Sequence, residues 1–214
     1  MKLNRRETIA LLGGLALPSF AQKKDDYLLL DQAEIDGVLA KAKRCPWAAE
    51  ALQQLLARAE AVIAKPMEIP DRGGQWGHWY TCGKDGSPLV MDSPTRHRCP
   101  KCNTIYSGEP YDSIYTARVH GGNSSAVRDL GLAFRFTGRE EFAKRAAALL
   151  AGYAEKYSSY PRHDPYNKDS VNSARVMSQA LDESTWITPM AWGYTMVRSI
   201  IPGREAIEET WNPS

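Results

Sequence analysis

The sequence has little net charge and few residues of the types that bind metals. Its 214 residues include 27 Lys and Arg against 25 Asp and Glu, with four His and four Cys. A protein that binds nucleic acid through its phosphates needs a strongly basic surface. The charge balance therefore argues against a nucleic-acid partner, while 43% hydrophobic residues suffice for one packed domain.

Long apolar runs are also scarce. The most prominent, residues 9–17, follows the basic pair Arg5 and Arg6 and is followed by small residues typical of a cleavage site. This pattern predicts a removable signal peptide at residues 1–21 and a periplasmic or secreted protein. The paired arginines favour the twin-arginine route, and the two residues after them differ from its usual pattern, which leaves an ordinary secretory signal open.

Removal of residues 1–21 would leave the mature chain neutral. The segment contains Lys2, Arg5, Arg6 and Glu7, so 24 basic and 24 acidic residues remain. No later apolar run approaches the ~20 residues needed to cross a bilayer. We therefore expect no membrane contact once the signal is removed.

Apolar residues at three- and four-residue spacing predict that most of the chain is helical. The stretch "PWAAEALQQLLARAEAVIA" is an amphipathic helix with Pro46 in its first turn, and a shorter helix at about residues 31–43 is expected as its hairpin partner. Together they make an amino-terminal hairpin within residues 22–64. The fold class is mainly α.

Residues 113–214 are expected to form further helical hairpins. Two helices joined at "TGREE" form one of them, and helical spacing returns from about Ser173 to Ile200. His120, which precedes two glycines, is expected to help start a helix. Successive hairpins of this kind are the units of helical solenoids and toroids.

Residues 65–112 differ from the helical segments, with Pro, Gly, Asp and Ser at close intervals. Within them "CGKDG" from Cys82 and "CPKCN" from Cys99 look like two copies of one tight turn. Asp85 stands where the first copy would have its second cysteine. This pattern predicts a small zinc-ribbon-like insertion of loop and hairpin.

A structural zinc ion would need four ligands in a tetrahedron. Cys82, Cys99 and Cys102 are three of them, and the fourth is left open. Its candidates are Asp85, His97 and His78. Such a site would be structural, because protein ligands fill the positions that a reacting water would need.

A disulfide is the alternative for an exported protein. Cys99 could pair with Cys102, or Cys82 could pair with either of them, and Cys45 would stay unpaired. The twin-arginine route bears on this choice, because it carries folded proteins out of a reducing cytoplasm, where a thiolate site can be filled first.

The segment "GGQWGHWYTCGKDGSPLVMDSPTRHRCPKCNTIYSGEPYD", a helical hairpin and then "SARVMSQALDESTWITPMAWGYTMV" resemble one protein family. Over roughly residues 70–200 the chain is similar to the amino-terminal region of heparinase II/III-like and alginate-lyase-like polysaccharide lyases. The resemblance implies an incomplete α/α toroid with the zinc-ribbon-like insertion, followed in the family by a large β-sandwich. It also implies cleavage of a uronic-acid polysaccharide, a uronan, by β-elimination.

The family's catalytic asparagine, histidine and tyrosine lie beyond the helix that "LDESTWITPMAWGYTMV" resembles. No position here matches them, so we name no catalytic residue. We expect the 214-residue chain to be a truncated lyase that lacks its β-sandwich and is inactive alone. The alternative is a non-catalytic carbohydrate-binding or scaffold module.

Polar residues in the second half are candidates for contact with the polysaccharide. One set is spaced four apart on the predicted helix: Arg175, Gln179 and Glu183. The loop before it contributes His163, Tyr166, Asn167 and Asn172. Both sets have an ordinary alternative, a solvated helix face and a polar loop.

Three aromatic residues precede the first turn of the insertion: Trp76, Trp79 and Tyr80. We expect them to pack over the ribbon. The alternative is that their faces stack on sugar rings.

Overall fold

The computed structural model describes residues 30–201. The predicted signal peptide lies outside the described residues. Within them no helix is both long and apolar enough to span a bilayer.

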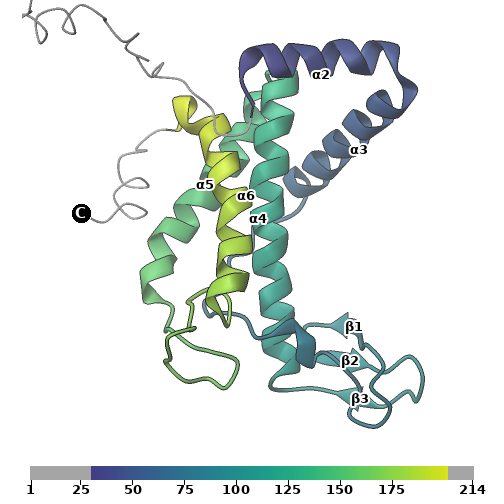
Figure 1. The fold of residues 1–214 in the computed structure, drawn as a ribbon, viewed down its shortest axis with the longest axis vertical. Helices are drawn as coiled ribbons and strands as arrows, with labels where there is room; N and C mark the ends of the chain where they lie inside the picture. The colour runs from purple at the N-terminus through teal and green to yellow at the C-terminus, as the bar shows by residue number, and fades with distance from the viewer. Residues whose placement is uncertain (1–29, 202–214) are drawn as a thin grey trace, which may run out of the picture.

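The described part is mainly helical, as predicted, with a small three-stranded sheet (Figure 1). The elements are α2 (Gln32–Arg44), α3 (Pro46–Ile63), η1 (Gly77–Trp79), β1 (Val90–Ser93), β2 (Arg96–Arg98), β3 (Ile105–Tyr106), α4 (Tyr111–Thr137), α5 (Glu140–Lys156), η2 (Tyr157–Ser159), α6 (Ala180–Val197) and η3 (Arg198–Ile200).

The first two helices have the bounds expected from the sequence. Asp31 and Glu34 form a capping box at the start of α2, and Pro46 occupies the first turn of α3. The two helices form a V in which α2 lies across one end of α4 (Figure 1). Arg58 on α3 reaches the buried Asp129 of α4 at 2.7 Å and ties the pair to the remaining helices.

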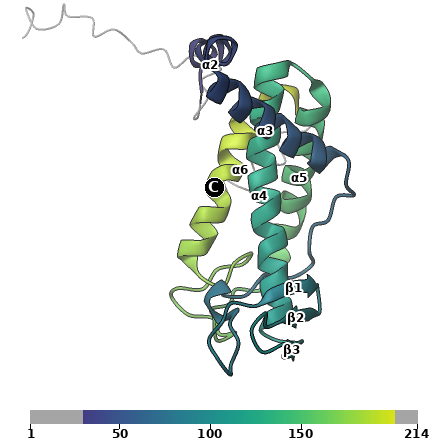
Figure 2. The same ribbon diagram turned by 90° about the vertical axis from the view of Figure 1, so that its right-hand side faces the viewer.

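Three long helices, α4, α5 and α6, run side by side and enclose the main core (Figures 1 and 2). The predicted α4–α5 hairpin is confirmed, and Gly138 closes α4 in the left-handed conformation with φ 72°. Helices α4 and α6 approach closely, because a Cβ added to Gly193 would lie 2.5 Å from the carbonyl oxygen of Val127. Whether these helices belong to a toroid stays a prediction.

The sheet and the loop between η2 and α6 lie at the same end of the molecule, near the amino end of α4 (Figure 1). The strand order is β1-β2-β3, with antiparallel pairing throughout. A second, small core of Tyr80, Cys82, Leu89, Cys99 and Ile114 joins the sheet region to α4. The insertion therefore rests on the helical body.

Two expectations about helix bounds are wrong. Helix α4 begins at Tyr111, so His120 lies in its middle and does not start it. The last long helix begins at Ala180, not near Ser173. Residues 173–179 are held in an irregular path by long-range hydrogen bonds, including 2.8 Å from the Gly74 N–H to the Val176 carbonyl, and such bonds leave no helical period in the sequence.

The buried side chain of His120 fixes the segment that precedes the sheet. Its Nε2–H donates to the Arg72 carbonyl at 2.9 Å, and its Nδ1 accepts from the Tyr153 hydroxyl at 2.8 Å. The Asn123 amide donates to the same hydroxyl at 3.0 Å. Burial lowers the pKa of His120 below its ordinary value of 6.5, so the folded protein keeps the ring neutral.

This lowered pKa predicts that the free energy of unfolding falls in mild acid. The unfolded chain binds a proton at His120 as the pH drops through 6.5, whereas the folded protein binds it only at lower pH. Urea unfolding at about pH 7.5 and about pH 5.5 measures the loss, in the range where histidines titrate. His120→Gln should reduce the pH dependence and cost about 1–3 kcal/mol at the higher pH.

The exposed His78 supplies the control for this experiment. His78→Gln should leave the free energy of unfolding at about pH 7.5 as in the wild type, because the exposed ring loses no buried hydrogen bond. An equal pH dependence in His120→Gln and the wild type would contradict the assignment.

Candidate metal centre and polar hollow

The two cysteine-containing turns have the same backbone geometry. The N–H of each first cysteine donates to the carbonyl five residues later, at 2.7 Å for Cys82 and 2.9 Å for Cys99. Each cysteine carbonyl accepts from the N–H four residues later, that of Gly86 at 2.8 Å and that of Asn103 at 3.0 Å. Gly86 and Asn103 are left-handed, with φ 70° and 58°, so both turns close in the same way.

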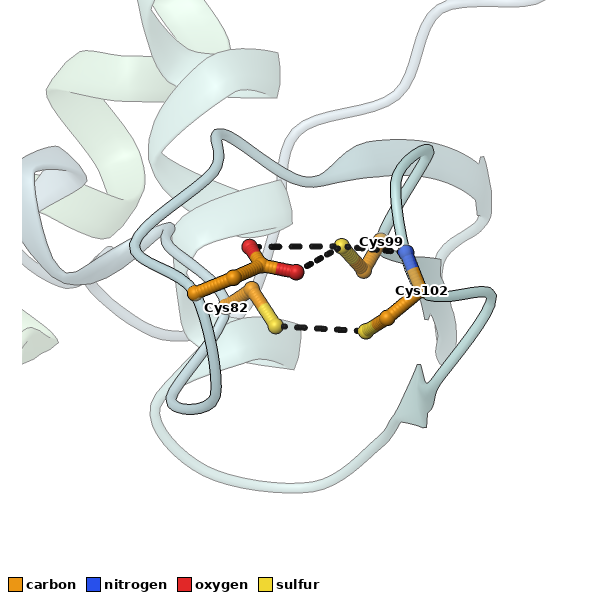
Figure 3. A group of neighbouring side chains, drawn as sticks. Cys82, Cys99 and Cys102 are labelled. Atoms are coloured by element: carbon orange, nitrogen blue, oxygen red, sulfur yellow. Dashed lines mark hydrogen bonds between the residues drawn. The ribbon is translucent and has the colours of Figure 1, made fainter.

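The turns bring four potential ligands together: Cys82 and Asp85 from the first, Cys99 and Cys102 from the second. Their ligand atoms all lie within 4.8 Å of one another. The Cys82 and Cys102 sulfur atoms are 3.6 Å apart, and the Cys99 sulfur is 3.5 Å from a carboxylate oxygen of Asp85 (Figure 3). A tetrahedral metal bound at about 2.3 Å would place its sulfur ligands about 3.8 Å apart, so the donor set fits one ion.

The structure does not contain the alternative disulfides. All four cysteines are free, and the Cys82–Cys102 separation of 3.6 Å is well beyond a bond between sulfur atoms. Cys45 lies between α2 and α3.

Hydrogen bonds favour the charged form of two of the ligands. The Tyr106 hydroxyl, helped by backbone N–H groups, lowers the pKa of Cys82 to about 7. The hydroxyl and backbone N–H of Ser87 hold the pKa of Asp85 well below its usual range. Burial raises the pKa of Cys99. Thiolate and carboxylate are the forms that bind a metal, so the first turn is prepared for it.

Of the three candidates for the fourth ligand, the structure places only Asp85 in the cluster. His97 is buried, donates from Nε2 to Asp112 at 2.9 Å and accepts at Nδ1 from the Tyr80 hydroxyl at 2.7 Å. His78 is exposed and packs on Trp76, with 4.7 Å between ring centroids. His97 instead joins the sheet to α4.

Sequence reasoning missed Tyr106, whose hydroxyl lies 3.2 Å from the Cys82 sulfur and accepts from the Gly83 N–H at 3.0 Å. Its position on β3 brings it back across the first turn. Only the pairing of β2 with β3, His97 opposite Tyr106, sets this contact, and no spacing in the sequence reveals it.

Two of the predicted saccharide contacts line one hollow. Arg175 and Glu183 surround it together with Tyr157 and Arg162, and its volume is about 350 Å³. They meet through the irregular path of residues 173–179, not through a shared helix face. The expectation that Arg175, Gln179 and Glu183 share one helix face is therefore wrong, whether that face contacts saccharide or solvent, because α6 begins only at Ala180.

Three of the other candidates, Gln179, His163 and Asn172, are engaged elsewhere. The Gln179 amide donates to Asp182 at 3.1 Å, and His163 Nε2 donates to the Gly74 carbonyl at 2.8 Å. Asn172 is exposed, and its carbonyl accepts from the Ala180 N–H at 2.9 Å at the start of α6. These residues organise the loop around the hollow.

The hollow is held by hydrogen bonds from its own charged residues. The Glu183 carboxylate accepts from the Val176 N–H at 3.0 Å and the Met177 N–H at 2.7 Å. The Arg175 guanidinium donates to the Tyr160 carbonyl. Burial, together with the Glu183 charge, raises the pKa of Tyr157 to about 12, so its hydroxyl stays protonated.

The aromatic residues before the first turn divide into two kinds. Tyr80 is buried in the small core, with the Arg118 guanidinium 4.4 Å from its ring centroid. Trp79 packs partly against the same core, and Trp76 is half-buried beside it.

Comparison with known proteins gives a partial match. No known family model matches the chain. A stretch of 95 residues, 44% of the chain, is 33% identical to an exo-oligoalginate lyase from Saccharophagus degradans. The match covers 12% of that protein, so it supports an alginate-lyase-like relationship for part of the chain.

The cluster predicts that a bound metal holds the insertion together. Cys102→Ser should speed limited proteolysis within residues 76–112 by about tenfold or more, because the small core alone supplies little burial. The α4–α5 hairpin should resist as before. Mass spectrometry of the early fragments measures both.

Cys45→Ser is the matched control, because Cys45 lies outside the cluster, and it should leave the cleavage pattern unchanged. Unchanged cleavage of the insertion in Cys102→Ser would count against a metal-dependent fold there.

Proposed function

We propose that this chain is the helical, saccharide-binding part of a periplasmic or secreted polysaccharide lyase that cleaves a uronan by β-elimination. The observation that carries the proposal is the 33% identity over 95 residues to an exo-oligoalginate lyase. The mainly helical fold agrees with it.

The polar hollow is the proposed saccharide site. Arg162 and Arg175 place two guanidinium groups at its wall, and guanidinium groups pair well with the carboxylates of uronic acids. The one acidic group in the wall, Glu183, already accepts two backbone hydrogen bonds. Two guanidinium groups against one carboxylate give the wall a formal charge of +1. Arg162 also pairs with Asp169, outside the wall, at 3.2 Å, so a uronate carboxylate would bind Arg162 in competition with that ion pair.

We assign binding, not bond cleavage, to this hollow. A lyase must neutralise the carboxylate, remove the adjacent proton and protonate the leaving oxygen. Tyr157 is the phenol in the wall, and its raised pKa of about 12 opposes its use as a base. This same property favours the second candidate function, a carbohydrate-binding or scaffold module without catalysis.

We further propose that the metal is zinc and that its role is structural. Three thiolates and one carboxylate in a tetrahedron suit Zn²⁺, and four protein ligands leave no open position for chemistry. Zinc bound by Cys82, Asp85, Cys99 and Cys102 would fix the two turns against each other. It would thereby fix the segment before them, which contacts the loop around the hollow.

Zinc content tests the metal assignment. Protein purified without chelator should contain about one zinc per chain by elemental analysis, Cys45→Ser should keep it, and Cys102→Ser should lose most of it. Metal-free protein with Cys99 and Cys102 oxidised to each other would establish the disulfide alternative.

Binding and activity assays test the function. The 214-residue chain should bind alginate oligosaccharides, and Arg162→Gln should weaken binding about threefold to tenfold through loss of a charged hydrogen bond. Arg96→Gln, on β2 away from the hollow, is the matched control for charge. Isothermal titration measures both.

Incubation with alginate, heparan sulfate, hyaluronan and polyglucuronate should give no rise in the absorbance of unsaturated product. A rise that disappears on changing Tyr157 or another tyrosine or histidine would show that the active site lies within this chain. Absence of binding to any uronan would overturn the proposed saccharide site.

A further inference from the structure

Three aromatic rings, one exposed and two half-buried, lie beside the loop that forms the hollow. We call Trp76, Trp79 and Tyr166 the aromatic patch. The Trp79 and Tyr166 rings meet edge to face with 5.7 Å between centroids, and Trp76 and Trp79 do so at 5.9 Å. The patch thus joins two segments far apart in the sequence, and it shares no residue with the wall of the hollow.

Tyr166 is 73% exposed, although it lies in an ordered turn. The Asp164 carboxylate accepts from the Tyr166 N–H at 2.9 Å and from the Lys168 N–H at 3.0 Å, and Asn167 between them has φ 58°. Ordering a turn costs conformational entropy, and an exposed ring gains little burial in return. Stability therefore does not account for holding this ring in solvent.

The turn is fixed against the segment that carries the two tryptophans. The Gln75 amide, which is 5% exposed, donates to the Asn167 side chain at 3.1 Å. Next to it, the Gly74 carbonyl accepts from His163 at 2.8 Å. Since Trp79 also packs on the small core beside the metal cluster, the three rings keep their relative positions.

We propose that the aromatic patch is a second saccharide-binding site, in which the face of Tyr166 stacks on a sugar ring of an acidic oligosaccharide. Aromatic faces bind the C–H face of a sugar without needing its hydroxyl groups. The exposed Lys168 lies two residues along the same turn and supplies a positive charge for a uronate carboxylate. The choice of an acidic sugar rests on the proposed function.

The aromatic patch and the hollow could bind the same ligand. Arg162 and Tyr166 belong to the same loop, so one chain of linked sugars could contact both places. Two weak contacts on one ligand raise its overall affinity well above that of either. The patch would then hold the polysaccharide while the hollow holds a carboxylate.

Tryptophan fluorescence is the direct readout, because two of the three rings are indoles. The 214-residue chain is titrated with oligomannuronate, oligoguluronate and a neutral cello-oligosaccharide. Tyr166→Ala should raise the Kd for the acidic oligosaccharides about fivefold or more, and Tyr166→Phe, which keeps the ring, should stay within about twofold.

Val171→Ala is the matched control, because Val171 lies in the same loop, is 91% exposed and belongs to neither site. It should bind as the wild type does. Circular dichroism should show that all three variants are folded.

The outcomes separate this inference from the proposed function. Uronan binding that is equal in Tyr166→Ala and the wild type overturns the patch and leaves the hollow intact. Binding of the neutral oligosaccharide that requires the Tyr166 ring, with no uronan binding, keeps the patch as a sugar site and overturns the proposed substrate class. Absence of binding to all three ligands overturns both.

Discussion

The arrangement of the polar features depends on two residues that have no side chain, Gly73 and Gly74. A Cβ on Gly73 would lie 2.3 Å from the carbonyl oxygen of Arg175, and one on Gly74 would lie 2.4 Å from the Cα of Ala117 on α4. The chain passes between α4 and the loop at a spacing that only glycine permits. The hydrogen bonds that organise the loop can form because this backbone lies so close.

The described residues form two hydrophobic cores of unequal size. The main core, mostly from α4, α5 and α6, contains large buried side chains such as Phe142, Trp186 and Met190, whose burial stabilises it. The small core beneath the sheet has five buried residues, of which two are cysteines. A metal would supply there the stability that apolar burial supplies elsewhere.

The features that could be predicted from the sequence are those set by residues close together in it, namely helices and tight turns. Apolar spacing located α2 and α3 and the α4–α5 hairpin. The repeated turn identified the three clustered cysteines and made Asp85 one of three candidates for the fourth ligand, and only the structure singles Asp85 out. The misplaced starts of α4 and α6 have one cause. His120 bonds to partners 33 and 48 residues away. The Val176 carbonyl, in the segment before α6, accepts from the distant Gly74 N–H, so tertiary contacts set both regions.

The compact spacing of the cluster has a consequence for the order of events during synthesis. All four ligands fall between Cys82 and Cys102, whereas contacts such as Arg58 with Asp129 join residues 71 apart. Closing a short loop costs less entropy than closing a long one, and local contacts form early. If the cluster binds a metal, the two turns would be able to capture it as soon as they leave the ribosome, before α4 exists to support them. Metal supply in the compartment of synthesis would then decide whether the later helices meet an ordered partner.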